Sequence, residues 1–195
     1  MTETTIDQVM EQASEALART HYAACEKLCL EAMDRALKQQ DYDHVARIAL
    51  PLQEARRQRR QAADDRGVHM LTGPRKAIAQ ILNDHPTGGL LLTAPPYTPQ
   101  DARDLAAEAR DRGLNVEVVL LDAPAQAAAF EWLLQQRGDR ILAECVDPDP
   151  RRHLEAICRN LEAIGDHEIA HQQLADLARR LSRADNSDKD EATSA

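Results

Sequence analysis

Aromatic residues are scarce in this chain, which has one Trp, one Phe and three Tyr among 195 residues. Its core must therefore be built from Leu, Ala, Ile and Val, a composition that suits closely packed helices better than an aromatic-rich sandwich of strands. Long apolar runs are missing too, since the most apolar stretch, Gly88 to Ala94, is far too short to span a bilayer. Residues 1–10 are polar and acidic and show no secretory signal, so we expect a cytoplasmic protein that contacts no membrane.

Motifs that would mark a nucleotide-binding protein or a common enzyme class are also missing. The chain contains no G-x-G-x-x-G, no G-x-x-x-x-G-K-[ST] and no G-x-S-x-G. Its four cysteines form no C-x-x-C, which favours reduced thiols in a cytosolic protein. A formal net charge of -9 repels phosphate backbones and anionic lipids, so no nucleic-acid partner is expected. No cofactor is expected either.

The first 66 residues predict helices. Thr5 to Gln8 fit a capping box that opens the first helix, and a second helix with one apolar stripe is expected over Tyr22–Gln39. Asp41 is the expected cap of a third helix, in which Pro51 predicts a kink or a break one residue earlier.

The middle third predicts a repeated strand–helix unit. Four apolar runs occur there: Val68–Leu71, Leu90–Leu92, Val116–Leu121 and Ile141–Val146. Each run precedes a proline that suits the first turn of a helix, and these prolines lie 25, 25 and 26 residues apart: Pro74, Pro99, Pro124 and Pro150. Strands and helices that alternate at such short intervals imply parallel strands joined by right-handed crossovers.

The sequence therefore predicts an α/β fold. A small four-stranded parallel sheet with crossover helices is expected in residues 67–150, flanked by helical segments at 1–66 and 151–184. In the last segment two apolar stripes are separated by Gly165 and Asp166, a helix stop followed by a cap. Residues 185–195 are rich in Ser, Asp and Lys and are expected to be disordered.

Residues 21–33, H-Y-A-A-C-E-K-L-C-L-E-A-M, resemble the second helix of a tetratricopeptide repeat, in which an aromatic residue is followed by small residues at the spacing of Tyr22, Cys25 and Ala32. Weaker echoes are Asp41-Tyr42 with Val45 and Asp166-His167 with Ala170. The 20-residue step from Tyr22 to Tyr42 differs from the family's 34-residue period, so at most one repeat-like hairpin and a third helix are expected over residues 5–65. The resemblance implies hairpin packing and a protein partner, although ordinary packed helices would show the same pattern.

Two groups of residues have the spacing of metal ligands. His167, Glu168 and His171 match H-E-x-x-H, but Asp166 is the expected helix cap, and zincin motifs lie well inside a helix. His21, Cys25 and Cys29 share one helix face, yet they spread over about 12 Å, too far for one ion to reach all three, which leaves only two of them with a distant ligand as a possible site. We therefore expect no metal site, and we interpret the cysteines as small core residues.

The carboxyl ends of the predicted strands are where an open parallel sheet would bind a ligand. The candidate residues for such a site are Thr72, Gly73, Arg75, Thr93, Tyr97 and Asp122. Lys76 would add positive charge beside Arg75. A basic run elsewhere could bind an acidic partner, although a solvated helix face is the preferred interpretation: Arg56, Arg57, Arg59 and Arg60.

Two functional hypotheses remain open. The first is a non-enzymatic interaction or scaffold protein, whose helices bind a protein partner. The alternative is a small-molecule-binding or enzymatic α/β module whose site lies at the strand ends.

Overall fold

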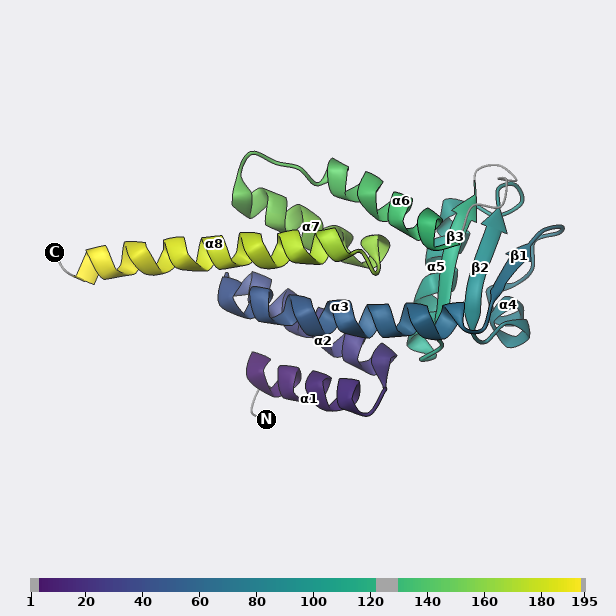
Figure 1. The fold of residues 1–195 in the computed structure, drawn as a ribbon, viewed down its shortest axis with the longest axis horizontal. Coiled ribbons are helices and arrows are strands. Elements are labelled where there is room, and N and C mark those ends of the chain that lie inside the picture. The colour runs from purple at the N-terminus through teal and green to yellow at the C-terminus, as the bar shows by residue number, and fades with distance from the viewer. Residues whose placement is uncertain (1–3, 122–129, 194–195) are drawn as a thin grey trace. The chain divides into compact units, whose positions relative to one another are not determined.

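The computed structural model describes residues 4–121 and 130–193, which form two compact units (Figure 1). We call residues 1–55 and 137–195 the helical unit and residues 56–136 the sheet unit. Most described residues are helical and one small sheet is parallel, which confirms a mixed helix and sheet composition. The boundaries differ from the expected 66/67 and 150/151, because the sheet unit begins inside one helix and ends inside another.

The helical unit is built from α-helices, several of which begin at a polar capping residue. Its elements are α1 (Ile6–Ala18), α2 (Tyr22–Lys38), most of α3 (Tyr42–Asp64), the second half of α6 (Phe130–Glu144), α7 (Pro150–Ile164) and α8 (Glu168–Thr193). The capping box at Thr5 is confirmed, since the Gln8 N–H donates to Thr5 Oγ1 over 3.3 Å and the Thr5 N–H to Gln8 Oε1 over 2.9 Å. Asp41 caps α3, as expected, by accepting the His44 N–H over 3.1 Å.

The core of the helical unit uses small side chains on α2 and α3. Cys25, Cys29 and Ala32 on α2 are fully buried, which lets neighbouring helices approach closely. The helix α3 runs through Pro51 without the break that the sequence allowed. Packing explains this continuity, because Leu52 and Ala55 beyond the proline are fully buried and hold the chain in helical register.

At the end of the chain, α8 is longer than the sequence predicts. It continues to Thr193, which corrects the expectation of a disordered tail from Asp185. Neither Gly nor Pro follows Gly165, so no residue in this stretch breaks a helix. Asp185 also accepts a hydrogen bond from Arg151 of α7 over 2.5 Å, which ties this part of α8 to its neighbour.

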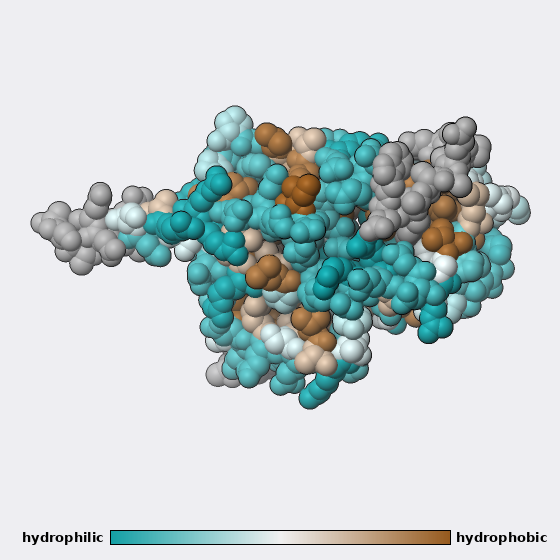
Figure 2. Space-filling view, in the orientation of Figure 1, coloured by the Kyte–Doolittle hydropathy of each residue, from teal (hydrophilic) through white to brown (hydrophobic). Residues whose placement is uncertain are grey.

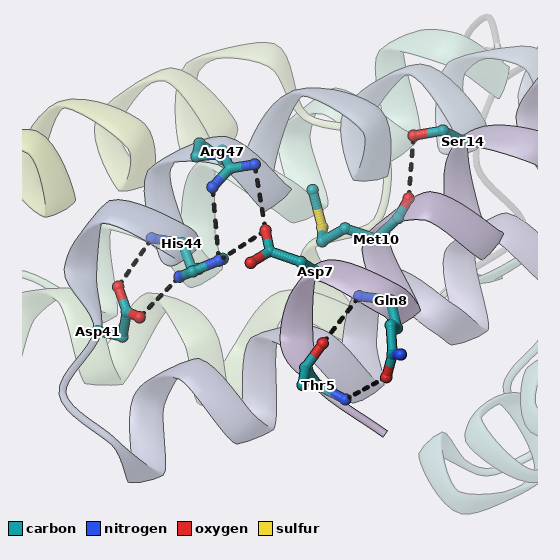
Figure 3. A network of polar contacts seen from close by, with 8 residues as sticks. All are labelled: Thr5, Asp7, Gln8, Met10, Ser14, Asp41, His44 and Arg47. Atoms are coloured by element: carbon teal, nitrogen blue, oxygen red, sulfur yellow. Dashed lines mark hydrogen bonds and ion pairs between the residues drawn. The ribbon is translucent and has the colours of Figure 1, made fainter. Parts of the chain in front are cut away.

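A polar network joins α1 to α3 on the surface of the helical unit (Figure 3). The ring of His44 lies between two carboxylates, with Nδ1 2.6 Å from Asp41 Oδ2 and Nε2 3.2 Å from Asp7 Oδ1. Arg47 donates to the same Asp7 oxygen over 3.4 Å. Burial opposes protonation of His44, but the hydrogen bonds with Asp7 and Asp41 outweigh it, and its pKa is raised.

The sheet unit contains three parallel strands in the order β1-β2-β3. These are β1 (Val68–Leu71), β2 (Gly88–Thr93) and β3 (Val116–Leu121), joined through α4 (Ile78–Asp84) and α5 (Pro99–Asp111). Val68 pairs with Gly89, and Gly88 pairs with Val116. All six residues of β2 are buried, as expected of a central strand covered on both faces.

Helices cover the two faces of this sheet unequally. On one face α4 and α5 pack through Ile81 and Leu105 against Leu90, Leu92 and their neighbours in β1 and β3. On the other face Leu91, Val119 and Leu121 pack against Leu134 of α6. Val68 and Met70 of the edge strand β1 remain about half exposed.

The fourth predicted strand, Ile141–Val146, is wrong: Ile141 to Glu144 form the last turn of α6, and Val146 lies beyond its end. The buried positions of this helix, Leu134, Gly138, Leu142 and Cys145, recur at steps of three and four residues, and Val146 is 69% exposed. Pro99 and Pro150 do open helices, as predicted. Pro74 does not, because α4 begins at Ile78, and Pro124 lies outside the described residues.

None of the described helices combines the length and the apolar composition that crossing a bilayer requires.

Candidate functional site

A cavity of about 360 Å³ opens beside the segments that follow β1 and β2. Its apolar wall comes from the segment before α4, from α4 itself, from β2 and from α5: Ala77, Ile78, Ile81, Leu92 and Leu105. Its polar lining consists of Arg75, Lys76, Tyr97 and Asp101. The volume lies at the lower end of the range for small-molecule sites, and an apolar wall with a few polar groups is typical of them.

Local sequence signals position the α5 side of the cavity. Thr98 caps α5, and Pro99 occupies its first turn, as predicted for this proline. Asp101 completes a capping box, since its carboxylate accepts the Thr98 N–H over 2.8 Å and the Thr98 Oγ–H over 2.7 Å. The cap thus fixes in place the one carboxylate found among the described residues of the lining.

Charged groups on the rim of the cavity form ion pairs. The Arg75 guanidinium donates to Asp101, and the Lys76 ammonium lies 3.1 Å from Asp84 Oδ2. Hydrogen bonds from Thr98, and secondarily the Arg75 charge, lower the pKa of Asp101. The carboxylate is therefore ionised at neutral pH, which keeps the pair with Arg75 intact.

Tyr97 connects the two loops that border the cavity. Its side chain follows β2, and its hydroxyl oxygen accepts the backbone N–H of Lys76, which follows β1, over 3.3 Å. The residue is only 4% exposed, so the phenol is held in the wall. Among the described residues that line the cavity, none is a His, a Cys or a Ser.

No protein-family model, curated protein or solved structure matches the chain. A functional proposal for this chain therefore rests on the geometry of the residues described above. The resemblance of residues 5–65 to a tetratricopeptide repeat accordingly stays a prediction.

Two of the six ligand residues predicted from the sequence, Arg75 and Tyr97, line the cavity. Thr93 does not, because its hydroxyl is buried and donates to the Leu71 carbonyl over 3.3 Å, joining the ends of β1 and β2. Thr72 and Gly73 are exposed and lie outside the lining. Asp122 lies outside the described residues.

Sequence reasoning missed Asp101 and the apolar wall as parts of this site. Asp101 shows no sequence signal for a binding site, because its position three residues after Thr98 indicates only a helix cap. The wall could have been found from Ile78 and Ile81 together with Leu105, since their spacing places them on the faces of α4 and α5 that pack on the sheet.

The basic run in α3 is not the solvated helix face that the sequence predicts. Arg56 is 3% and Arg59 is 5% exposed, and Arg59 Nη2 donates to the Leu114 carbonyl over 3.3 Å. Arg60 is half-buried, and Arg57 alone of the four is exposed. Arg56, Arg59 and Arg60 share one helix face, and because this face is buried or half-buried, the run presents no continuous exposed basic surface to a partner.

The H-E-x-x-H residues take structural positions. His167 is fully buried and is itself the cap of α8, since its Nδ1 accepts the Ala170 N–H over 3.2 Å. This corrects the assignment of Asp166 as the cap. Nε2 of His167 lies 3.0 Å from Asp139 Oδ1, so both ring nitrogens are engaged. His171 is buried while Glu168 is exposed, so the three side chains do not converge.

The residues of the second candidate metal group, His21, Cys25 and Cys29, also differ in burial. Cys25 and Cys29 are fully buried with their Sγ atoms 4.0 Å apart, whereas His21 is exposed. In the part of the chain that the structure describes, no three His, Cys, Asp or Glu side chains gather as a metal site requires.

Proposed function

We propose that the sheet unit is a binding module for a small molecule, which it holds in the cavity that follows β1 and β2. The observation that carries this proposal is the lining itself, which combines five apolar residues with three charged side chains and a buried phenol.

The position of the cavity supports the same proposal. Open parallel sheets bind ligands beyond the carboxyl ends of their strands, where the following loops diverge. Arg75 and Lys76 lie in the loop after β1, while Tyr97 lies in the loop after β2. Binding without chemical conversion is the simpler role, because the single carboxylate of the lining is already used as a helix cap.

A variant that fills the cavity tests the proposal. Ala77 lies in the lining and is exposed, so Ala77→Trp places an indole in the hollow without disturbing the core. Ala79→Trp, at an exposed position of α4 outside the lining, is the matched control. A fragment library screened by heteronuclear NMR should give shifts around Arg75 and Tyr97 in the wild type and in Ala79→Trp but not in Ala77→Trp. Fragments that bind all three proteins equally, or none of them, would contradict the proposal.

Protein binding by the helical unit is a second proposal, and an exposed apolar side chain on α3 favours it. Leu50 is 59% exposed although the neighbouring residues Ile48, Ala49 and Leu52 are fully buried. Figure 2 shows the apolar residues of one face of the molecule as separate patches in a polar surface. The tetratricopeptide-like pattern of α2 points to the same class of partner.

Site-specific photo-crosslinking in cells would test this second proposal. A benzophenone amino acid at position 50 should give a discrete crosslinked species, whereas the same group at Asp43, an exposed position on α3, should not. Equal labelling from both positions would indicate nonspecific contact and remove the proposal.

A further inference from the structure

Three groups that can donate hydrogen bonds lie together on the polar side of the cavity. The guanidinium of Arg75 and the ammonium of Lys76 are neighbours in sequence, and the Tyr97 hydroxyl touches the backbone of Lys76. That hydroxyl accepts a hydrogen bond, but its own proton donates to no residue that the structure describes. A buried donor of this kind is suited to an acceptor atom supplied by a ligand.

We infer that the cavity binds a small carboxylic acid with an apolar body, whose carboxylate is held by Arg75 and Tyr97. This inference rests on the proposed function and names the class of its ligand. Guanidinium and carboxylate groups match in bidentate geometry, and the phenol adds a third hydrogen bond to the same anion.

Arg75 can leave Asp101 and bind a ligand carboxylate in its place. Asp101 keeps two hydrogen bonds from Thr98 when Arg75 moves away, so its carboxylate is not left unsatisfied. The Arg75 side chain is 62% exposed, so it can turn toward a ligand without leaving a packed site. In the absence of ligand, Asp101 occupies the place that a ligand carboxylate would take.

The donors of the lining favour an anion over a cation. The charges themselves balance, because Arg75 pairs with Asp101, and Lys76 pairs with Asp84 just outside the lining. The preference comes instead from Arg75 and Tyr97, which both offer hydrogen bonds that a carboxylate can accept. A cationic ligand would have to displace Arg75 from Asp101 and then lie beside the released guanidinium, which like charges oppose.

The apolar residues of the lining determine the size and polarity of the ligand body that fits. Ile78, Ile81, Leu92 and Leu105 offer only aliphatic surface, and a cavity of about 360 Å³ accommodates a short chain. Each methylene buried against such a wall should tighten binding about fourfold, until the cavity is full.

Calorimetric titration with a homologous series tests the inference. The probes are acetate, butanoate and hexanoate, with hexan-1-ol and hexylamine as ligands of equal length and different head group. Affinity should rise from acetate to hexanoate, and hexanoate should bind at least about tenfold more tightly than the alcohol or the amine.

Variants then separate the roles of the polar residues. Arg75→Gln should weaken hexanoate about tenfold or more and leave hexan-1-ol unchanged, while Arg103→Gln, at an exposed position of α5, is the matched control. Tyr97→Phe should weaken hexanoate about fivefold. Asp101→Asn keeps an oxygen for the cap but removes the competing charge, so it should tighten hexanoate, whereas Asp104→Asn should not change it.

The outcomes distinguish a failure of the inference about the carboxylate from a failure of the proposed small-molecule site. If hexan-1-ol or hexylamine binds as tightly as hexanoate, or if Arg75→Gln has no effect, the inference about the carboxylate is wrong and the small-molecule site stands. If neither this series nor the fragment library binds the wild type, both are wrong.

Discussion

Gly138 lies inside α6, where an alanine would ordinarily be the better residue by about 1 kcal/mol. A Cβ atom added at this position would lie 2.2 Å from Cδ2 and 2.8 Å from Cγ of the His167 ring. Both distances are far shorter than carbon atoms tolerate. We therefore expect Gly138→Ala to destabilise the protein, against the direction that helix propensity predicts.

The His167 ring cannot move aside without cost. It is fully buried, it caps α8 through Nδ1, and it lies 3.0 Å from Asp139 through Nε2. Overpacking a core costs about 1–3 kcal/mol and a lost cap about 1 kcal/mol, while the gain in helix propensity offsets about 1 kcal/mol. Gly138→Ala should thus lower the free energy of unfolding by about 1–3 kcal/mol.

Urea denaturation followed by circular dichroism measures this change in the free energy of unfolding. The same substitution in a second variant, which lacks the His167 ring, shows whether the ring causes the change. His167→Ser removes the ring but keeps a capping oxygen, so Gly138→Ala in that background should be neutral or stabilising by up to about 1 kcal/mol. The reversal of sign between the two backgrounds is the expected result. If Gly138→Ala stabilises the protein in both, the packing of His167 against α6 is refuted.

Three further predictions concern stability and thiol chemistry. Because Asp7 and Asp41 raise the pKa of His44 against the effect of burial, its ion pairs stabilise the protein below the unfolded pKa of about 6.5, and this stabilisation is lost as the pH rises through the folded pKa. His44→Gln should therefore lower the free energy of unfolding more near about pH 5.5 than near about pH 8.5, by up to about 1 kcal/mol. An equal loss at both pH values would contradict the network. Thr98→Ala should lower the free energy of unfolding by about 1 kcal/mol in urea titrations, while Thr98→Ser should retain most of it. Burial, with a smaller effect from Glu155, raises the pKa of the Cys158 thiol to about 12. The thiol should therefore react slowly with DTNB at about pH 8 until the protein is unfolded. Fast labelling of Cys158 in the native protein would contradict its burial.

Several helix starts and the three strands could be predicted because their signals are local. Thr5 with Gln8, and Thr98 with Asp101, carry the geometry of a cap within four residues. Val116–Leu121 predicts a strand by its β-branched residues alone.

Other features depend on residues distant in sequence and were therefore missed. Ile141–Val146 has the composition of a strand, but Leu142 and Cys145 belong to the core of the helical unit, and this packing makes the segment helical. Arginines such as Arg56 predict solvent exposure by type, and only the fold shows that this one is buried.

Only part of the candidate site could be predicted from the sequence. Arg75 and Tyr97 follow strands and could be placed by the rule for parallel sheets. Asp101 could not be assigned to the site, because its contact with Arg75 joins residues 26 positions apart.

The parallel arrangement of the three strands has a consequence for how the chain acquires its structure. Val68 must find Gly89, 21 positions later, and Gly88 must find Val116, 28 positions later, so each pairing closes a large loop. The hairpin of α1 and α2 closes over a connection of only three residues, 19–21. Rapid-mixing experiments should accordingly find early protection in that hairpin, while amides of β2 acquire theirs in a slower step.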